Sequence, residues 1–447
     1  MKGYTEYKYS EIQWIGDIPQ HWQIKKIKHT TYVKGRIGWQ GLKSDEFVDE
    51  GPYLVTGTDF INGKVNWNSC YHISDKRYNE APPIQLKEND LLITKDGSIG
   101  KLALVINKPE KAILNSGIFV TRPIKDQYYS KYLFWVLSSP VFRGFIRYFE
   151  KGSTIKHLYQ ETFINFAYPF PPRHEQLLIS DFLTKKSGEI DKVIRLKEQQ
   201  IETLQKYRQS LIKETVTKGL NQDVKMKDSG VEWIGQTPTR WEVRRIKHLT
   251  KILRGKFSHR PRNDPKLYDG NHPFIQTGDI SNSDKYIRTF SQTLNEKGFK
   301  VSKEFPSGTL VMTIAANIGD LAILNFNACF PDSIVGFFPN PKVQIEYLYY
   351  NLSAMRTEFF KHATINTQMN LNIEQIGSLY TCLPPLEEQL QIVEYINNQT
   401  EQINTVITKI KSQISVLKDY QQSLIYEAVT GKIDVRNYKE SDLEVKL

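Results

Sequence analysis

The chain has 447 residues, 39% hydrophobic and 24% charged, and a formal net charge of +11 at pH 7. This length and composition predict two or three domains with their own cores, which excludes a disulfide-stabilised miniprotein and a disordered tail. Three distant cysteines, a polar N-terminus and no long apolar run predict a reduced, cytoplasmic protein without a membrane span. The basic excess and 12% aromatic content favour a polyanionic partner, although many basic proteins bind no nucleic acid.

Much of the chain occurs twice. The segment from Trp14 to Trp22 reappears 219 residues later, from Trp233 to Trp241. The same offset aligns Thr94, Ile99 and Gly100 with Thr313, Ile318 and Gly319. Farther along, an offset of 213 aligns Pro171, Pro172, Glu175 and Gln176 with Pro384, Pro385, Glu388 and Gln389. A period this long is typical of a duplicated module rather than of a solenoid.

The first module begins with residues 1–173, where short β-rich runs such as 90–94 and 101–106 lie between Gly, Asn and Asp turn signals. These runs predict a mixed α/β domain, which the proline pair closes. Residues 174–219 then predict one long helix, because their apolar residues follow a heptad. The polar, charged stretch 220–230 is interpreted as a linker.

The second module follows the same plan, with an α/β domain over 231–385, a long helix over 386–433 and a tail over 434–447. Such helices are too long to lie on one small domain, so they are expected to pack on each other or on a partner. The expected seam residues are Ile194, Ile201, Leu204 and Leu211 in the first helix and Ile407, Ile410, Ile414, Leu417 and Leu424 in the second.

Polar residues interrupt this seam at Lys197, Arg208 and Gln421, where they can fix the register of the helices. Other apolar helix residues lie off the seam, and they either dock a partner or belong to an ordinary helix-pair core. These residues are Ile212, Val216, Ile425 and Val429.

Motifs of catalysis are missing from the sequence. It has no phosphate-binding G-x-x-x-x-G-K-[ST] loop, no G-x-S-x-G elbow, no H-E-x-x-H and no Cys/His cluster with zinc spacing. The tetrapeptide Phe170–Arg173 also lacks the polar first residue and terminal aromatic of an amino-methyltransferase motif. Any catalysis is therefore expected from another chain.

Basic and polar loop residues remain as candidates for DNA contacts, because Lys and Arg meet phosphates and Arg can read guanine edges. Lysines and arginines occur at equivalent places of both modules, although any one of them can equally be a solvated surface charge. The candidates of the first module are Lys34, Arg36, Lys95, Ser98, Lys101, Lys151 and Ser153. Those of the second module are Arg254, Lys256, His259, Arg260, Arg262, Asn317 and Asn366.

The loops of the two modules share a frame but differ in content. Lys95–Ser98 in the first module corresponds to Ile314–Asn317 in the second, between aligned Thr and Ile residues. If the shared positions are scaffold, the differing polar positions are where two unlike DNA half-sites would be read. Neutral drift of surface loops after duplication is the alternative.

These features resemble the specificity subunits of type I restriction-modification systems. The resemblance rests on Glu11–Trp22 and its repeat Val231–Trp241, on the frame Asp90–Gly100, on the Pro-Pro-x-x-Glu-Gln junctions and on both helix ends. It covers nearly the whole chain, leaving out the tail after residue 433. It implies an α+β fold with two target-recognition domains, each followed by a long helix, and antiparallel pairing of the two helices.

The resemblance also implies a function in a larger assembly. The chain would recognise a bipartite, asymmetric site in double-stranded DNA, with one half-site per domain and the helices setting the spacing. Two methyltransferase subunits and two restriction subunits would be its partners. S-adenosylmethionine, ATP and Mg²⁺ would belong to those chains, with no cofactor bound here. The alternatives are a coiled-coil scaffold whose duplicated domains bind proteins, and a self-sufficient nuclease or methyltransferase.

Overall fold

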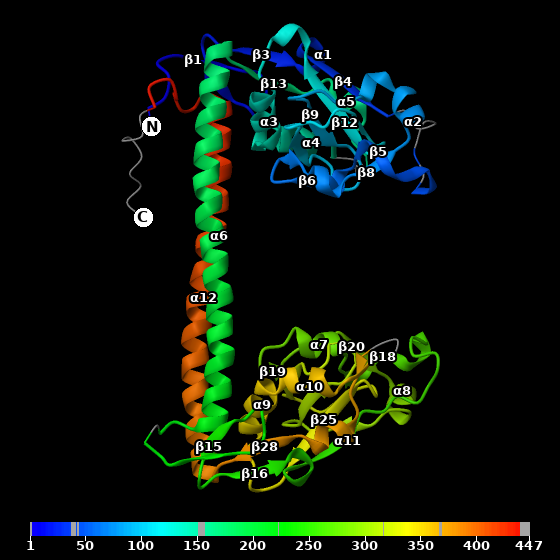
Figure 1. The fold of residues 1–447 in the computed structure, drawn as a ribbon, viewed down its shortest axis with the longest axis vertical. Coiled ribbons are helices and arrows are strands. Elements are labelled where there is room, and N and C mark those ends of the chain that lie inside the picture. The colour runs from blue at the N-terminus through cyan, green and yellow to red at the C-terminus, as the bar shows by residue number, and fades with distance from the viewer. Residues whose placement is uncertain are drawn as a thin grey trace. The chain divides into compact units, whose positions relative to one another are not determined.

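The structure is a computed structural model that describes residues 2–36, 42, 44–150, 157–221, 223–315, 317–365 and 369–438. It contains two compact units, Met1–Lys197 with Ser412–Leu447, and Glu198–Lys411. The division points fall inside two long helices, so each unit holds one mixed α/β domain and a portion of each helix (Figure 1). The sequence prediction instead gives each long helix a segment of its own, separate from the two domains.

The first domain contains a six-stranded and a three-stranded sheet. The larger sheet has the order β4 (Thr31–Gly35), β12 (Ile118–Pro123), β9 (Leu91–Thr94), β10 (Leu102–Leu104), β7 (Lys64–Val65) and β6 (Phe60–Ile61). The smaller has the order β11 (Ala112–Leu114), β5 (Phe47–Val55) and β8 (Tyr71–Ile73). Two strand pairs are β1 (Tyr7–Tyr9) with β2 (Asp17–Pro19) and β3 (Gln23–Lys26) with β13 (Ala167–Phe170). The helices are α1 (Ile27–Thr30), α2 (Asp75–Asn79), α3 (Ser130–Ser138), α4 (Pro140–Glu150) and α5 (Gln160–Phe163).

The central strand β9 explains the core of this domain. It pairs antiparallel with β12 on one side and β10 on the other, and all four of its residues are buried. A strand covered on both faces needs a continuous apolar run rather than alternation, and Leu91, Leu92 and Ile93 supply it. Helix α3 packs against β9 and β10, which fixes one end of the β9–β10 connection.

The second domain repeats this plan with small differences. Its larger sheet has the order β17 (Thr250–Arg254), β25 (Ile334–Pro339), β22 (Leu310–Thr313), β23 (Leu321–Leu324) and β19 (Tyr286–Ile287). Its other large sheet has the order β20 (Gln292–Leu294), β18 (Tyr268–Phe274), β24 (Ala328–Cys329) and β21 (Glu304–Phe305). The strand pairs are β14 (Met226–Asp228) with β15 (Gln236–Pro238), β16 (Glu242–Arg245) with β28 (Tyr380–Leu383), and β26 (Thr364–Ile365) with β27 (Met369–Asn370). The helices are α7 (Thr277–Ser281), α8 (Glu296–Lys300), α9 (Ile345–Ala354), α10 (Arg356–His362) and α11 (Ile373–Ser378).

The order β17-β25-β22-β23 matches β4-β12-β9-β10 strand for strand, with antiparallel pairing throughout. The predicted tandem duplication of a mixed α/β domain is therefore confirmed.

The two long helices are α6 (Arg173–Lys218) and α12 (Leu386–Val429), of 46 and 44 residues. At 1.5 Å per residue, each would be about 65–70 Å long. Both begin directly after a proline pair, because the residue before proline disfavours helix and the helix can start only beyond it. Within each unit, portions of α6 and α12 lie side by side (Figure 1).

Polar side chains cross this helix pair where the sequence interrupts the seam. In the first unit Lys197 donates to Gln413 at 2.8 Å and Gln421 donates to Asp191 at 2.9 Å. In the second unit Arg208 donates to Asn404 at 2.9 Å. Residue numbers rise along one helix as they fall along the other, so the portions in each unit run antiparallel. These bonds suit only one register of the pair.

The predicted seam is buried at most positions. Ile194, Leu211, Ile407, Ile410, Ile414 and Leu424 are buried, whereas Ile201, Leu204 and Leu417 are half-buried. The structure favours the core alternative for the four off-seam residues. Val216, Ile425 and Val429 are buried inside their own units, and Ile212 packs against the core of the second domain, because both helix ends rest on a domain.

The linker and tail also differ from expectation. Residues 226–228 of the predicted linker form β14, the repeat of β1, so the second module starts earlier than 231. The first part of the tail is packed, since the Asp434 amide donates to the Lys2 carbonyl at 2.9 Å and the Tyr438 ring lies 4.9 Å from the Phe182 ring. The segments that follow the two long helices thus pack against the domains more than their polar composition predicts.

Candidate nucleic-acid interface

The loop between β9 and β10 has the same internal frame as the loop between β22 and β23. The Thr94 hydroxyl donates to the Ser98 carbonyl and accepts from the Lys101 amide at 2.9 Å. The Thr313 hydroxyl likewise donates to the Asn317 carbonyl and accepts from the Asp320 amide at 3.1 Å. Side-chain to backbone bonds of this kind hold the shape of a turn without using the side chains inside it.

A glycine completes each frame. The amides of Gly100 and Gly319 donate to the carbonyls of Thr94 and Thr313, both at 2.9 Å. Their φ angles are +84° and +83°, a left-handed conformation that favours glycine. The aligned Thr and Gly residues are therefore scaffold, and the residues between them are free to differ.

The loop contents differ in charge and exposure. In the first module Asp96 and Ser98 are exposed, and the Lys95 ammonium lies 5.3 Å from the centre of the Phe119 ring. In the second module Ile314 is buried, and the exposed Asn317 donates to the Ser281 hydroxyl at 3.1 Å. The two loops thus present different polar groups from the same backbone frame.

A second segment joins each loop. The Leu158 amide donates to the Lys95 carbonyl at 2.8 Å, and His157 contacts the Asp96 carboxylate. In the second module the Leu371 amide donates to the Ile314 carbonyl at 3.0 Å. Three candidates on the neighbouring stretches, Lys151, Ser153 and Asn366, lie outside the described residues.

The end of β4 lies at the same edge of the sheet, because β12 pairs Phe119 with Gly35 and Ile118 with Thr94. Lys34 is exposed there, as is Lys101 beyond the loop. Arg36 is different: it is buried, and its Nε donates to the Leu114 carbonyl at 3.2 Å. Burial lowers the pKa of Arg36 to about 10. Arg36 is thus an internal structural residue in this conformation, which corrects its proposed DNA contact.

The corresponding basic residues of the second module are exposed, except the half-buried His259, and most of their side chains already have partners. Arg254 donates to the backbone carbonyl of Asp332 at 2.6 Å, and Arg260 and Arg262 both approach the Asp332 carboxylate. His259 lies 3.2 Å from Asp264. Lys256 is exposed, with its backbone amide bonded to Phe330. DNA contacts here would require exchange of these surface ion pairs, which are weak in water.

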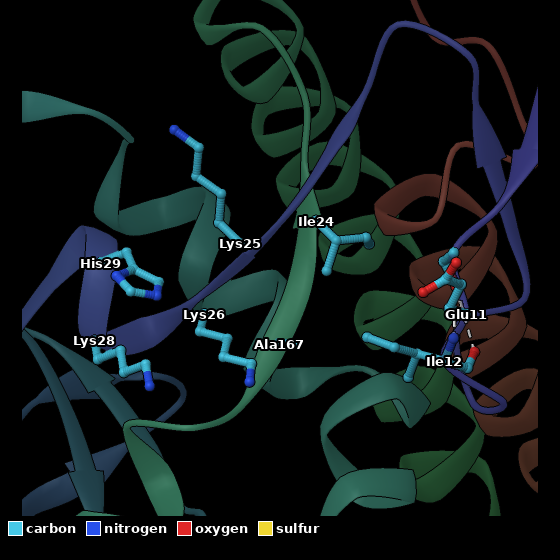
Figure 2. Close-up of a pocket in the computed structure, with 9 residues that line it drawn as sticks. Glu11, Ile12, Ile24, Lys25, Lys26, Lys28, His29 and Ala167 are labelled. Atoms are coloured by element: carbon cyan, nitrogen blue, oxygen red, sulfur yellow. Dashed lines mark hydrogen bonds between the residues drawn. The ribbon is translucent and has the colours of Figure 1, made fainter.

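A basic cavity of about 650 Å³ lies at the opposite end of β4, where the chain enters that strand. Figure 2 shows Lys25, Lys26, Lys28 and His29 around it, with Glu11 across the cavity. The equivalent Arg244 and Arg245 of the second module instead contact Glu242 at 2.9 Å and the Tyr380 hydroxyl at 3.0 Å. This cavity does not adjoin the β9–β10 loop.

The repeated Pro-Pro-x-x-Glu-Gln motif joins each helix to its domain. Glu175 accepts hydrogen bonds from the Trp22 indole at 3.0 Å and the Tyr4 hydroxyl at 2.7 Å, and contacts His21 at 2.7 Å. Burial raises the pKa of this carboxyl, but the three bonds outweigh burial and lower it below its usual value. In the second module Glu388 accepts from the Trp241 indole at 3.0 Å.

Two pairs of exposed apolar side chains were missed by the seam prediction. Leu177 and Leu390 occupy equivalent positions, and so do Tyr207 and Tyr420; all four are exposed. The identity of each pair across the repeat was the available signal. Heptad counting overlooks such residues because it selects buried positions only.

Cysteines and metal-ligating side chains are the remaining candidates for reactive groups in the described residues. The three cysteines are buried and free. Within the described ranges no cluster of His, Cys, Asp and Glu could hold a metal ion, and no helix has the length and apolarity needed to cross a membrane.

The fold and the loops together define a protein with two duplicated recognition-type domains on paired long helices. The family model for the "type I restriction modification DNA specificity domain" matches residues 19–206 and 238–416. The chain belongs to this family, so the resemblance inferred from the sequence is confirmed.

Relatives and a solved structure agree with this assignment. The chain is similar to the type I restriction enzyme MjaVIII specificity subunit of Methanocaldococcus jannaschii, with 26% identity over 98% of both chains. It is 20% identical to the EcoKI specificity subunit of Escherichia coli K12, over 94% of this chain and 90% of that one. A solved chain from work on assembly and conformational transition of the type I R-M system matches with a TM-score of 0.71, 16% identity and coverage of 93% and 99%.

Proposed function

We propose that this chain is the DNA-recognition subunit of a type I restriction-modification complex and reads a bipartite, asymmetric site. Each domain would read one half-site. The observation that carries the proposal is the pair of loops held by identical Thr and Gly contacts but filled with different residues. A duplicated frame with unlike contents suits two unlike half-sites, since base readout depends on the side chains presented.

The long helices are proposed to set the separation of the half-sites and to dock the partner subunits. The register-specific bonds of Lys197, Arg208 and Gln421 support a pair of fixed length. Leu177, Leu390, Tyr207 and Tyr420 replace the buried off-seam residues as docking candidates, since large exposed apolar groups favour interaction surfaces. Because these residues occupy equivalent positions in the two repeats, they suit the docking of two copies of one partner.

Two methyltransferase and two restriction subunits are proposed as these partners, acting on DNA in the cytoplasm. Catalysis, with S-adenosylmethionine, ATP and Mg²⁺, would belong to those chains. This chain would contribute DNA affinity and specificity, so its removal would abolish the activity without removing any catalytic group.

Purification of the tagged full chain from its own cells tests the proposal. We expect an adenine methyltransferase subunit to co-purify, and the complex to retard duplex DNA strongly at low salt and weakly at high salt. Stable partners without retardation of any duplex would favour the protein-binding scaffold instead. Turnover by the chain alone would revive the self-sufficient enzyme.

A further inference from the structure

A groove in the first unit lies beside the β9–β10 loop. It has a volume of about 520 Å³ and is lined on one side by Ile99 and Gly100 of that loop and on the other by α3 and α4. Helix α4 contributes Phe142 and Ile146 to the groove, together with Arg143 and Arg147. The groove therefore continues directly from the loop that we propose reads bases.

The two arginines give this groove its charge. Arg143 and Arg147 are one turn apart on the exposed side of α4, so their side chains are neighbours. The Arg143 guanidinium donates to the amide oxygen of Gln422, which is uncharged. Neither arginine forms an ion pair with any residue in the described part of the chain. Their positive charges are thus not balanced by a carboxylate there.

The second unit has a different charge arrangement beside Gly319, the repeat of Gly100. Arg356 is the first residue of α10, the helix that follows α9 as α4 follows α3, and it forms an ion pair with Asp320 at 2.8 Å. Asp320 also accepts a bond from Ser281 at 2.5 Å, so its carboxylate is held in place. Asp320 is the repeat of Lys101, at the offset of 219 that aligns Gly100 with Gly319.

The local charge therefore differs between the modules. Beside Gly100 the first module has Lys101, Arg143 and Arg147, whereas beside Gly319 the second has Arg356 paired with the carboxylate of Asp320. Arginines without a carboxylate partner in the first module alone suit a polyanion that contacts only that module.

We infer that the groove lined by Arg143 and Arg147 binds backbone phosphates of DNA flanking the first half-site, a contact that the second module lacks. This inference rests on the proposed DNA-recognition function. Arg–phosphate contacts position a duplex without reading its sequence, so the groove adds affinity equally to specific and unrelated duplexes. The loop beside it supplies the specificity.

The test is the salt dependence of DNA binding by the full chain with its co-purifying partners. Labelled duplexes with and without the recognised site are titrated between about 50 and about 200 mM KCl. Each lost phosphate contact lowers the slope of log affinity against log salt by about 0.9, so R143Q/R147Q is expected to reduce it by about 2. The loss of affinity should be the same factor for both duplexes.

Matched variants separate charge from structure. R143K/R147K keeps both charges and is expected to restore the slope, whereas Gln422→Ala removes only the helix contact and should leave it unchanged. Arg356→Gln should also leave the slope unchanged, because Asp320 already neutralises that arginine. Asp320→Lys places a lysine at the position of Lys101 and releases Arg356 from its ion pair, and is expected to steepen the slope by about 1 to 2.

An unchanged slope for R143Q/R147Q, with normal binding by the unsubstituted complex, would overturn the groove inference and leave the proposed function intact. Loss of the partner subunits from R143Q/R147Q at an unchanged slope would also overturn it, in favour of an acidic protein surface. No DNA binding by the unsubstituted complex would overturn both proposals.

Discussion

The two domains differ in the side chains of the β9–β10 and β22–β23 loops and agree in the hydrogen bonds that hold the backbone of these loops. Thr94 and Thr313 make the same bonds, whereas the residues that follow them present a lysine and an aspartate in one copy and a buried isoleucine in the other. This difference indicates that the hydrogen bonds of the loop backbone and the side chains between them can change independently of one another. Backbone geometry demands the threonine and glycine, and nothing in the frame demands the residues between them.

The helix junction is a second comparison, and there the copies differ in strength. Glu175 hydrogen-bonds with three side chains and its own side chain is 2% exposed, whereas Glu388 contacts Trp241 and Arg240 and is 21% exposed. Removing a buried carboxylate that satisfies several donors costs more than removing a partly exposed one, because each buried donor is left unsatisfied. The first junction is therefore expected to be the more sensitive to loss of its carboxylate.

The largest expected effect comes from exchanging loop contents. Replacing Lys95–Ser98 with the residues of Ile314–Asn317 should change one half of the recognised sequence and leave the other half intact. Specific and non-specific affinities of DNA-binding proteins typically differ by about 10³ or more, so the original site should fall to the level of an unrelated duplex. Methylation mapping of cells with the exchanged chain measures this. An unaltered motif would remove the loop from base readout.

Lengthening the helices tests whether they set the spacing. One heptad inserted after Lys197 and another after Lys411 would lengthen each helix by about 10 Å and preserve the heptad pattern. If the helices set the separation, the preferred spacer should grow by about three base pairs, at about 3.4 Å per pair. The same mapping reads the spacer length. Retention of the original spacer would contradict the role assigned to the helices.

The junctions should differ in stability. Glu175→Leu leaves the Trp22 and Tyr4 donors without their acceptor and should cost about 3 kcal/mol, whereas Glu388→Leu, which removes one buried donor's partner, should cost about 1 kcal/mol. Urea unfolding combined with hydrogen exchange assigns each loss to its unit. Equal losses would show that the extra contacts of Glu175 contribute nothing.

The loop frame can be weakened without changing its contents. Thr94→Val and Thr313→Val each remove one donor and one acceptor and should reduce specific DNA affinity about tenfold, equivalent to about 1.4 kcal/mol. Thr203→Val on the exposed side of α6 is the matched control and should have no effect. Unchanged affinity for the loop variants would mean that backbone bonds alone hold the frame.

The smallest effect concerns pH. Because the folded-state pKa of Glu175 is lowered, its stabilisation is present above the ordinary glutamate pKa of about 4.3 and is lost as pH falls through the folded value. The stability difference between the unsubstituted chain and Glu175→Gln should therefore shrink from pH 7 toward pH 3, by at most about 1.4 kcal/mol per pH unit. Thermal unfolding at several pH values measures it, and a constant difference would contradict the assignment.

The repeat made much of the fold predictable. It located both domains, both proline-terminated junctions and both helices, because the same contacts must form twice from the same residues. The predictions were weaker where a polar segment packs on a distant one. Residues 226–228 look like a linker because they match residues 7–9 of the first module at the lysine only. The burial of Arg36 depends on the Leu114 carbonyl, 78 residues away.

The candidate interface was predictable as loops rather than as residues. Sequence comparison found that Lys95–Ser98 and Ile314–Asn317 differ, but not that Asp332 already neutralises two of the predicted arginines. Arg143 and Arg147 were overlooked because their importance lies in what surrounds them. Aligning Lys101 with Asp320 across the repeat would have pointed to this difference in charge, since Asp320 is the counter-ion of Arg356.

The central claim is that each domain reads one half of a divided site. Mapping of DNA adenine methylation in the cells of origin, with and without the gene for this chain, tests it most directly. The account predicts that deletion removes one asymmetric motif made of two specific parts separated by a fixed number of unspecified bases. Loss of a single continuous motif, or an unchanged methylation pattern in cells whose methyltransferase partner is active, would contradict it.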